Sequence, residues 1–468
     1  SVRWVDVNKA GEGGMEVRCR LVARDFKGRD TGRDDLFAAT PPLEAKRMLL
    51  SRAATITVGS CSRKLLFIDA KKAHLNPRCR EDVFIELPEE CGAGPGICGK
   101  LDYWLYGFRK AAVAWEDLYS SKLVESGFTR GVTCVVVFYH AERDISLVVH
   151  GDDFTFEGTG QHLLWVADLM RSWFEIKVRA LLGPDEGDDK HVVILGRHVR
   201  WTAEGIEYEA DPKHRKLIME HFGFDEESSG LVFNGEKDWK KEEEWEEVLL
   251  EKDEATVFRG VAARANFLSL DCPDLQFPVK QMSREMAKPM VGSWKRMKKI
   301  ARYLVNRKRV VWHFYWQDHT CKSHVCGDSD WGGRTGSRKS TSGGVWMIGG
   351  HCIKTWSVTQ GAYALSSAEA EFYAMIEAVL RAKGLRNLAV EVGFTDLENI
   401  VHIGTDSSAA KSFVGRQGLG KMKHLEIRDL WLQKEVNDGK VVVHKVLGTE
   451  NPSDLGTKIL NAAEISER

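Results

Sequence analysis

The sequence predicts an α+β protein followed by a second domain of α/β type. Over the first 200 residues, short apolar runs typical of strands alternate with helical stretches, which favours a mainly antiparallel sheet. From about residue 321 the pattern restarts with its own strands, helix and Gly-rich turns, so a domain boundary is expected near His319 and Thr320. The chain has 468 residues, enough for two to four domains with substantial cores.

The expected elements follow this division. The first part should contain a helix over Ala112–Ser126. It should also contain four strands: Leu65–Ile68, Val135–Tyr139, Ile145–Val149 and Val192–Leu195. Residues 206–320 are more helical and more charged. The last part should contain five strands and a long helix that begins near Ser366 or Ser367, one of which acts as its N-cap. These strands are Val325–Asp328, Val345–Ile348, Ile353–Trp356, Ile400–Ile403 and Val441–Val446.

The composition is that of an ordinary globular chain, with 43% hydrophobic and 29% charged residues. No apolar run approaches the roughly 18 residues that a membrane span needs, so no membrane partner is expected. Ten cysteines without metal-like spacing indicate reduced thiols in an intracellular protein. The N-terminus lacks a Met and a signal peptide, which suggests a piece of a longer chain.

The 67 basic and 68 acidic side chains nearly cancel, yet they are segregated along the chain. Residues 236–254 are strongly acidic and are expected to form a linker or an exposed helix. Residues 295–309 are strongly basic, with apolar residues at helical spacing beside them. The basic face is either simply solvated or follows a nucleic-acid backbone. Its residues are Lys295, Lys298, Lys299 and Arg302.

A pair of adjacent carboxylates, Asp152 and Asp153, follows the apolar run Ile145–Val149. Gly151 precedes them, so the segment is typical of a tight hairpin turn. Two carboxylates held together in an apolar setting repel each other unless a cation shares them. The alternative is an ordinary hairpin with a solvent-exposed acidic turn. A two-metal site needs carboxylates from at least two elements, and Asp69, at the end of the strand Leu65–Ile68, is a candidate for the other element.

Ordered sequence blocks over nearly all of the chain resemble the polymerase region of copia-type retrotransposons. Each block alone is weak, but their order and spacing are specific. The blocks are Arg18–Phe26, Phe67–Asn76, Leu105–Trp115, His150–Asp153, Ile194–Gly196, Phe258–Val261, Pro273–Leu275, Met282–Arg284, Arg338–Gly343, Leu365–Phe372 and Lys423–Ile427. The resemblance implies a right-hand polymerase of fingers, palm and thumb (residues 1–235), a thumb or connection region (236–320) and an RNase H-like domain (321–468).

In that family, residues at the positions of Asp69, Asp152 and Asp153 form the polymerase metal site. Arg18 and Arg20 lie in the fingers block, and one of them is expected to contact the triphosphate. Two further nucleotide-binding positions depart from the family pattern. His74 stands where a Phe or Tyr packs against the sugar, and Lys110 replaces a Gln.

The last part of the chain carries a second set of carboxylates. The resemblance assigns the metal ligands of an RNase H-like site to Asp328, Glu371, Asp406 and Asp454, and carboxylates from such different elements can converge on two magnesium ions. Glu369 and Glu371 lie about 200° apart around a helix, so only one of them can face the site, and the inner stripe of the helix favours Glu371. Asp330 is a rival to Asp328. His424 is expected to be a packed or surface residue rather than a catalytic one.

Two functions follow. The first is an RNA-directed DNA polymerase with RNase H activity that uses two Mg²⁺ per active site, with Mn²⁺ as an alternative. Its partners would be an RNA template, a DNA primer, the RNA–DNA hybrid and deoxynucleoside triphosphates, in a cytoplasmic particle or the nucleus. The second is a decayed or repurposed copy that binds nucleic acid without polymerising, which the departures at His74, Lys110 and His150–Gly151 favour.

Overall fold

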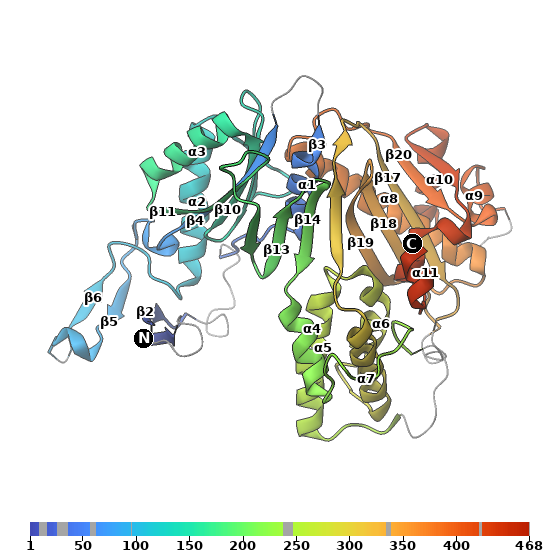
Figure 1. Cartoon of the computed structure of the whole chain (residues 1–468), viewed down its shortest axis with the longest axis horizontal. Helices are drawn as coiled ribbons and strands as arrows, with labels where there is room; N and C mark the ends of the chain where they lie inside the picture. Colours follow the sequence, from blue (N-terminus) through green and yellow to red (C-terminus); the bar gives the residue numbers. More distant parts are fainter. Residues whose placement is uncertain are drawn as a thin grey trace. The chain divides into compact units, whose positions relative to one another are not determined.

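The computed structural model describes residues 1–8, 16–25, 36–56, 62–94, 96–236, 247–333, 338–420 and 424–467. The chain forms two compact units: residues 1–53, 61–189 and 391–393 make the first, and the remainder makes the second. Both units are mixtures of helices and strands (Figure 1), so the predicted combination of the two is confirmed. The units divide at residues 189 and 190 rather than at 235 or 320, and the three-domain division stays a prediction.

The first unit is built on a six-stranded antiparallel sheet with strand order β11-β4-β10-β9-β8-β7. Apolar side chains on both faces of its central strands are buried, which explains why these short runs form strands. The expected run Val135–Tyr139 becomes a strand only from Val137. The strands are β4 (Arg63–Ala70), β7 (Thr129–Arg130), β8 (Val137–His140), β9 (Ile145–His150), β10 (Asp153–Thr159) and β11 (Ile176–Leu182).

Helices cover this sheet on both faces. One face packs against α2 (Arg109–Glu125) and α3 (Gly160–Trp173), and its core includes Ile68 and Phe154. Because successive strand residues point to opposite faces, Asp69 and Asp153 point away from that core. α1 (Leu43–Ala53) contacts β4, β9 and β10.

Smaller elements complete the first unit. They are the hairpin of β1 (Val2–Asn8) and β2 (Val17–Ala23), the pair β5 (Phe84–Glu86) and β6 (Cys98–Lys100), and the short turns η2 (Ala73–Leu75) and η3 (Glu89–Cys91).

Up to residue 318 the second unit contains an antiparallel sheet of order β12-β13-β14-β15 and a group of helices. A buried apolar cluster joins the helices. The elements are β12 (His191–Ile194), β13 (Arg197–Trp201), β14 (Gly205–Ala210), β15 (Val311–Tyr315), α4 (Pro212–His221), α5 (Lys252–Ser269), α6 (Pro273–Ser283) and α7 (Val291–Asn306), with a short parallel pair, β3 (Thr55–Ile56) and β16 (Gln317–Asp318). Of the acidic stretch 236–254, residues 237–246 lie outside the described residues, and the stretch ends within α5.

A five-stranded sheet of order β19-β18-β17-β20-β21 forms the rest of the second unit (Figure 1). β17, β18 and β19 are antiparallel, whereas β20 and β21 run parallel to β17. Gly327 of β17 lies directly on helix α8, where an added Cβ would be 3.3 Å from the Ala378 Cβ. The elements are β17 (Ser323–Asp330), β18 (Thr341–Ile348), β19 (His351–Thr359), α8 (Ser367–Glu391), β20 (Val401–Thr405), α9 (Ser408–Val414), η5 (Ile427–Leu430), α10 (Trp431–Asn437), β21 (Val441–Lys445), η6 (Gly448–Glu450), η7 (Pro452–Gly456) and α11 (Ala462–Glu467).

Every strand expected in the last part falls within or beside an observed strand, and the Ser366 hydroxyl accepts a hydrogen bond from the Glu369 N–H at 3.2 Å, as an N-cap does. Within the described ranges, no helix combines the length and apolar character that crossing a membrane requires.

Gly107 allows strand β2 to pack closely against the segment that precedes α2. Its φ of +91° is unfavourable for other residues, and an added Cβ would collide with the Ala23 backbone of β2. The Ala23 N–H donates to the Tyr106 carbonyl at 2.8 Å across this contact. The close contact between β2 and residue 106 therefore requires glycine at position 107.

We expect Gly107→Ala to lower the free energy of unfolding by about 1–2 kcal/mol or more, because it combines backbone strain with a collision. Gly260→Ala is the matched control, since Gly260 lies exposed in α5 with no atom close to the added Cβ, and alanine favours a helix by up to about 1 kcal/mol. Urea denaturation measures both variants. Equal stability of Gly107→Ala and the wild type would contradict this account of the contact.

Candidate active sites

The register of β4 and β10 brings the first set of predicted carboxylates together. Asp69 and Asp153 are direct partners across the antiparallel pair. Asp152 occupies the turn before β10, and its carbonyl accepts a hydrogen bond from the Ala70 N–H at 2.9 Å. Trp115 holds the hairpin tip in place, because its indole N–H donates a hydrogen bond to the Gly151 carbonyl at 2.9 Å. The three aspartates thus share one end of the sheet.

A basic side chain already accompanies Asp153. Arg179 lies at a bulge in β11, where the register shifts between Val178 and Ala180, and its guanidinium contacts the Asp153 carboxylate at 3.1 Å. The ligand atoms of Asp69, Asp152 and Asp153 are not all within 4.8 Å of one another. Their donor chemistry suits Mg²⁺, which prefers carboxylate oxygens, although these oxygens are less closely gathered than those of the second site.

Three predicted nucleotide-binding residues lie beside this hairpin, and Tyr106 links them. The Arg20 guanidinium lies 5.3 Å from the centre of the Tyr106 ring, which in turn lies 4.8 Å from the His74 ring. Desolvation raises the pKa of Tyr106, and the charges of Arg20, Asp152 and Arg18 also act on it. Desolvation lowers the pKa of His74, and the Asp152 carboxylate opposes that shift. A row of flat side chains therefore leads from the β2 arginines to the carboxylates.

Tyr106 and Arg179 were missed in the sequence analysis. Tyr106 belongs to the block Leu105–Trp115, so the sequence could have indicated it as a nucleotide-binding candidate. Arg179 could not have been found in this way, because no sequence pattern reliably predicts a one-residue β-bulge. Lys110, in the first turn of α2, forms an ion pair with Glu81, and its nucleotide-binding role stays a prediction.

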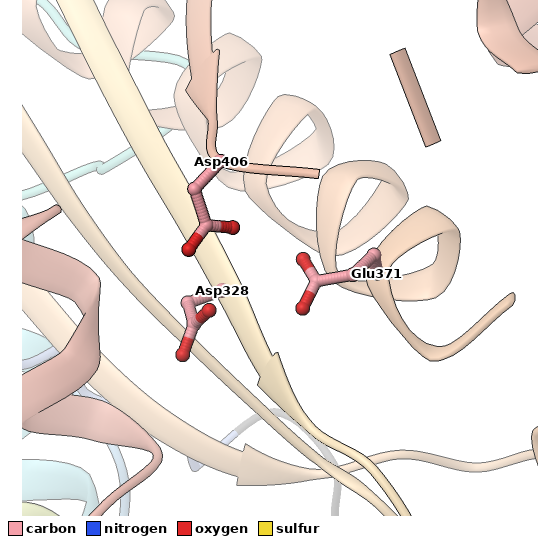
Figure 2. A group of neighbouring side chains, drawn as sticks. All are labelled: Asp328, Glu371 and Asp406. Carbon is pink, nitrogen blue, oxygen red and sulfur yellow. The ribbon is translucent and has the colours of Figure 1, made fainter. Parts of the chain in front are cut away.

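The second set of carboxylates gathers at one end of the five-stranded sheet (Figure 2). Asp328 comes from β17, Asp406 directly follows β20, and Glu371 lies in the second turn of α8. One ligand oxygen from each lies within 4.8 Å of the others, and among the described residues this is the one such group of three potential metal ligands. The parallel pairing of β17 and β20 places the ends of both strands at this edge.

Burial makes this group costly to ionise. Asp328 is 2% exposed and Glu371 8%. Desolvation, followed by the neighbouring Asp328 charge, raises the pKa of Glu371 to about 8, and desolvation also raises the pKa of Asp328. The Ser329 N–H and hydroxyl donate to Glu371 Oε1 at 3.2 and 2.9 Å, whereas the buried Oε2 has no hydrogen-bond partner among the described residues. An unsatisfied oxygen in a group of three carboxylates fits a divalent cation.

Asp454 joins this group through a lysine. The Lys458 ammonium lies 2.5 Å from Asp454 Oδ1 and 3.8 Å from Asp328 Oδ2. Thr457 donates its hydroxyl to Asp328, and the Asn451 side chain caps the turn that carries Asp454. All four predicted carboxylates therefore lie in one neighbourhood, with Lys458 providing positive charge between two of them.

The alternative residues point elsewhere. Glu369 accepts a hydrogen bond from the Leu365 N–H at 3.0 Å and contacts His424 Nε2 at 2.9 Å. Asp330 accepts a hydrogen bond from the Thr341 N–H at 2.5 Å. His424 has a side chain 44% exposed, as expected for a surface residue.

Comparison with known proteins bears on both sites. Residues 1–182 match the reverse transcriptase (RNA-dependent DNA polymerase) family. Over 460 residues the chain is 26% identical to the retrovirus-related Pol polyprotein from transposon TNT 1-94 of Nicotiana tabacum, a match that covers 95% of this chain and 33% of that polyprotein. Over nearly its whole length the chain is therefore similar to Pol polyproteins from transposons, and its first 182 residues match the reverse transcriptase family.

Other matches extend over nearly the whole chain. The Pol polyprotein from transposon RE2 of Arabidopsis thaliana is 23% identical over 479 residues, covering 98% of this chain and 31% of the polyprotein. The chain thus spans about a third of the length of these relatives. A solved structure of the foamy viral protease-reverse transcriptase dRH in complex with ds DNA is 12% identical and covers 98% of this chain and 67% of that one, with a TM-score of 0.26.

The predicted basic helix is α7, and its lysines and arginine differ in their surroundings. Lys299 forms an ion pair with Glu236, and Arg302 donates to the Ser229 carbonyl at 3.2 Å. Lys298 is exposed, while Lys295 is partly buried. Nucleic-acid binding by these residues stays a prediction, with Lys298 the best placed of them.

We expect the metal-free protein to lose stability as pH rises from the ordinary Glu371 pKa of 4.5 to about 8. The folded state binds the Glu371 proton more tightly than the unfolded state does. The stability that this proton contributes is therefore lost as the buried carboxyl group ionises. Glu371→Gln should flatten this dependence, and each kcal/mol corresponds to about 2–4 °C in the melting temperature.

Melting curves in a chelator at several pH values measure the effect. Glu377→Gln is the control, because Glu377 lies on the same helix but is paired with Arg381 at its surface. A pH dependence that is unchanged in Glu371→Gln would contradict the account of a buried, ionisable cluster.

Proposed function

We propose that this chain is an RNA-directed DNA polymerase joined to an RNase H, which copies RNA into DNA and hydrolyses the RNA strand of the hybrid. The pairing of Asp69 with Asp153 beside the Asp152 turn carries the polymerase part of the proposal. The group of Asp328, Glu371 and Asp406 carries the nuclease part. Similarity to the reverse transcriptase family and to a Pol polyprotein from a transposon supports the proposal.

In this proposal the elements take the parts of a right-handed polymerase. The β1–β2 hairpin with Arg18 and Arg20 belongs to the fingers, the six-stranded sheet is the palm, and helices α4 to α7 form the thumb and connection. The five-stranded sheet with α8 is the RNase H-like domain.

The residues around Tyr106 would bind the incoming deoxynucleoside triphosphate. Arg20 is the better placed of the two arginines for its phosphates, since it stacks on Tyr106 in the row that ends at Asp152. The flat ring of His74 would lie against the sugar and exclude a 2′-hydroxyl, as a Phe or Tyr does in the resembled family. A lowered pKa keeps this ring neutral, which suits packing rather than phosphate binding.

Both sites would hold divalent metal ions, two Mg²⁺ at each, with Mn²⁺ as an alternative. Asp69, Asp152 and Asp153 would hold them in the palm, and Asp328, Glu371, Asp406 and Asp454 in the nuclease site. Such ions supply an activated oxygen nucleophile and stabilise charge on the phosphate. Arg179 must leave or share Asp153, and Lys458 balances negative charge at Asp328 and Asp454.

Separate substitutions should separate the two activities. Asp152→Asn should reduce template-directed deoxynucleotide incorporation about 100-fold or more, because several kcal/mol of charge stabilisation are lost. Glu371→Gln should instead abolish cleavage of the RNA strand of a hybrid and leave incorporation near the wild-type rate. Primer extension and hybrid cleavage with Mg²⁺ measure both, each variant serving as the control for the other.

A wild-type chain that binds hybrid in a salt-sensitive manner but incorporates no nucleotide would reject the polymerase proposal. That result would favour the alternative of a decayed or repurposed copy. Equal incorporation by the wild type and Asp152→Asn would reject the assignment of the palm carboxylates.

The RNA template, DNA primer and their hybrid would be the nucleic-acid partners, and α7 offers one contact. Lys298→Ala should weaken hybrid binding and reduce the magnitude of the salt dependence by about one counterion, as loss of a phosphate contact does. Lys216→Ala is the control, since Lys216 is an exposed lysine of α4 in an i,i+4 pair with Glu220. An unchanged salt slope for Lys298→Ala would show that this face is merely solvated.

A further inference from the structure

An exposed group of large side chains, the aromatic patch, lies just beyond the end of β17 and consists of Trp331, Tyr363 and Leu365. The Trp331 indole N–H donates to the Ala364 carbonyl at 3.1 Å, which holds its ring against the segment that carries the other two residues. The exposed fractions of the three residues are 52%, 58% and 68% in that order. Single large apolar residues are exposed on most proteins, whereas a contiguous group of them indicates a contact surface.

Positive charge borders the aromatic patch. The Lys339 ammonium lies 5.3 Å from the centre of the Tyr363 ring and donates to the Gly361 carbonyl at 2.9 Å. A cation over an aromatic ring is attracted by the ring's electrons, which keeps the lysine beside the patch. An ammonium has three donors, so Lys339 can contact a phosphate while it keeps this hydrogen bond. Arg338, next to it in the chain, is exposed.

The two segments that carry the patch are joined beneath it by Ser340, which is fully buried. The Gly332 N–H donates to the Ser340 hydroxyl at 3.2 Å, and the Gln360 N–H donates to the Ser340 carbonyl at 2.8 Å. Gly333 allows the turn after Trp331 to fold back, because its φ is +38° and an added Cβ would collide with the Lys339 carbonyl. The rings and the lysine therefore form one preorganised surface.

This surface continues from the carboxylate group of the second unit. Trp331 follows Asp328 by three residues, which is at most about 10 Å of extended chain. On the other side, the Leu365 N–H donates to Glu369 at the start of α8, the helix that carries Glu371. A nucleic-acid strand advances roughly 3.4 Å per nucleotide, so a strand held at the carboxylates would reach the patch within about three nucleotides.

We propose that Trp331, Tyr363 and Lys339 form a subsite that contacts the RNA–DNA hybrid within about three nucleotides of the bond to be cut. This inference rests on the RNase H activity proposed above. A helix of A-form geometry has a wide, shallow minor groove that displays its sugars, against which flat rings can pack while a lysine contacts a phosphate. Aromatic rings combined with basic side chains are typical of nucleic-acid surfaces, and the adjoining carboxylates give the same partner a reason to bind here.

Single-turnover cleavage of a hybrid in Mg²⁺, measured at increasing concentrations of the full chain, tests the proposal. Trp331→Ala and Tyr363→Ala should each raise the apparent dissociation constant of the cleaving complex about 5-fold or more, because apolar contact area is lost. The rate at saturating protein should stay near that of the wild type, since the carboxylates are unchanged. Lys339→Gln should reduce the salt dependence of this constant by about one counterion.

Two further variants make the result specific. Trp331→Phe keeps an aromatic ring and should recover most of the affinity that Trp331→Ala loses. Tyr315→Ala is the matched control, because Tyr315 on β15 is a tyrosine of similar exposure, 54%, that lies outside the patch. It should cleave with the affinity of the wild type. Melting temperatures identify any variant that folds poorly, and Tyr363→Ala then replaces Trp331→Ala.

Wild-type affinity in both Trp331→Ala and Tyr363→Ala would overturn the proposal and would assign the exposed rings to a protein partner instead. A lower rate at saturation with unchanged affinity would also overturn it, because the residues would then act on the carboxylates rather than on the hybrid. A wild-type chain that cleaves no hybrid would give a different result: it would reject the nuclease activity itself, and the subsite with it.

Discussion

The structure depends on balancing negative charge that strand pairing brings together. In an antiparallel or parallel ladder, residues at strand ends have fixed neighbours, so carboxylates placed there cannot separate to relieve their repulsion. In the first unit Asp153 faces Asp69 and contacts Arg179. In the second, Lys458 lies between Asp328 and Asp454. The positive charge at both sheet ends comes from a side chain of the protein itself.

Negative charge is also balanced by basic side chains in the interior of the first unit, where the ion pairs hold a helix on the sheet. Glu157 of β10 is fully buried, and Arg52 of α1 and Arg63 of β4 both contact it, Arg52 at 2.9 Å. Both arginines also reach Asp144 at 2.6 Å. Removing one partner of such a buried network leaves a charge without compensation and typically costs several kcal/mol. This network fixes α1 on the face of the sheet that also presents Asp69 and Asp153.

Much of this arrangement was accessible from the sequence, because apolar runs and turn residues determine local structure. The runs around Leu65–Ile68 and Ile145–Val149 fall within β4 and β9, and the Gly151–Asp152 turn joins β9 to β10. Glu371 was distinguished from Glu369 by helical geometry, and it is Glu371 that lies with Asp328 and Asp406. What sequence could not provide was contact between distant segments. The bulge at Arg179 and the stacking of Arg20 on Tyr106 both arise from tertiary contacts.

The lysine beside the nuclease carboxylates has a consequence for any titration of this protein. Because the Lys458 ammonium already lies beside Asp328 and Asp454, a divalent ion bound to these carboxylates would compete with it for their negative charge. The apparent affinity for the ion would then include the free energy of displacing the Lys458 ammonium into solvent. The heat measured in a titration would contain both steps. A phosphodiester nearby would offer the displaced ammonium a new partner, so substrate and ion would strengthen each other's binding.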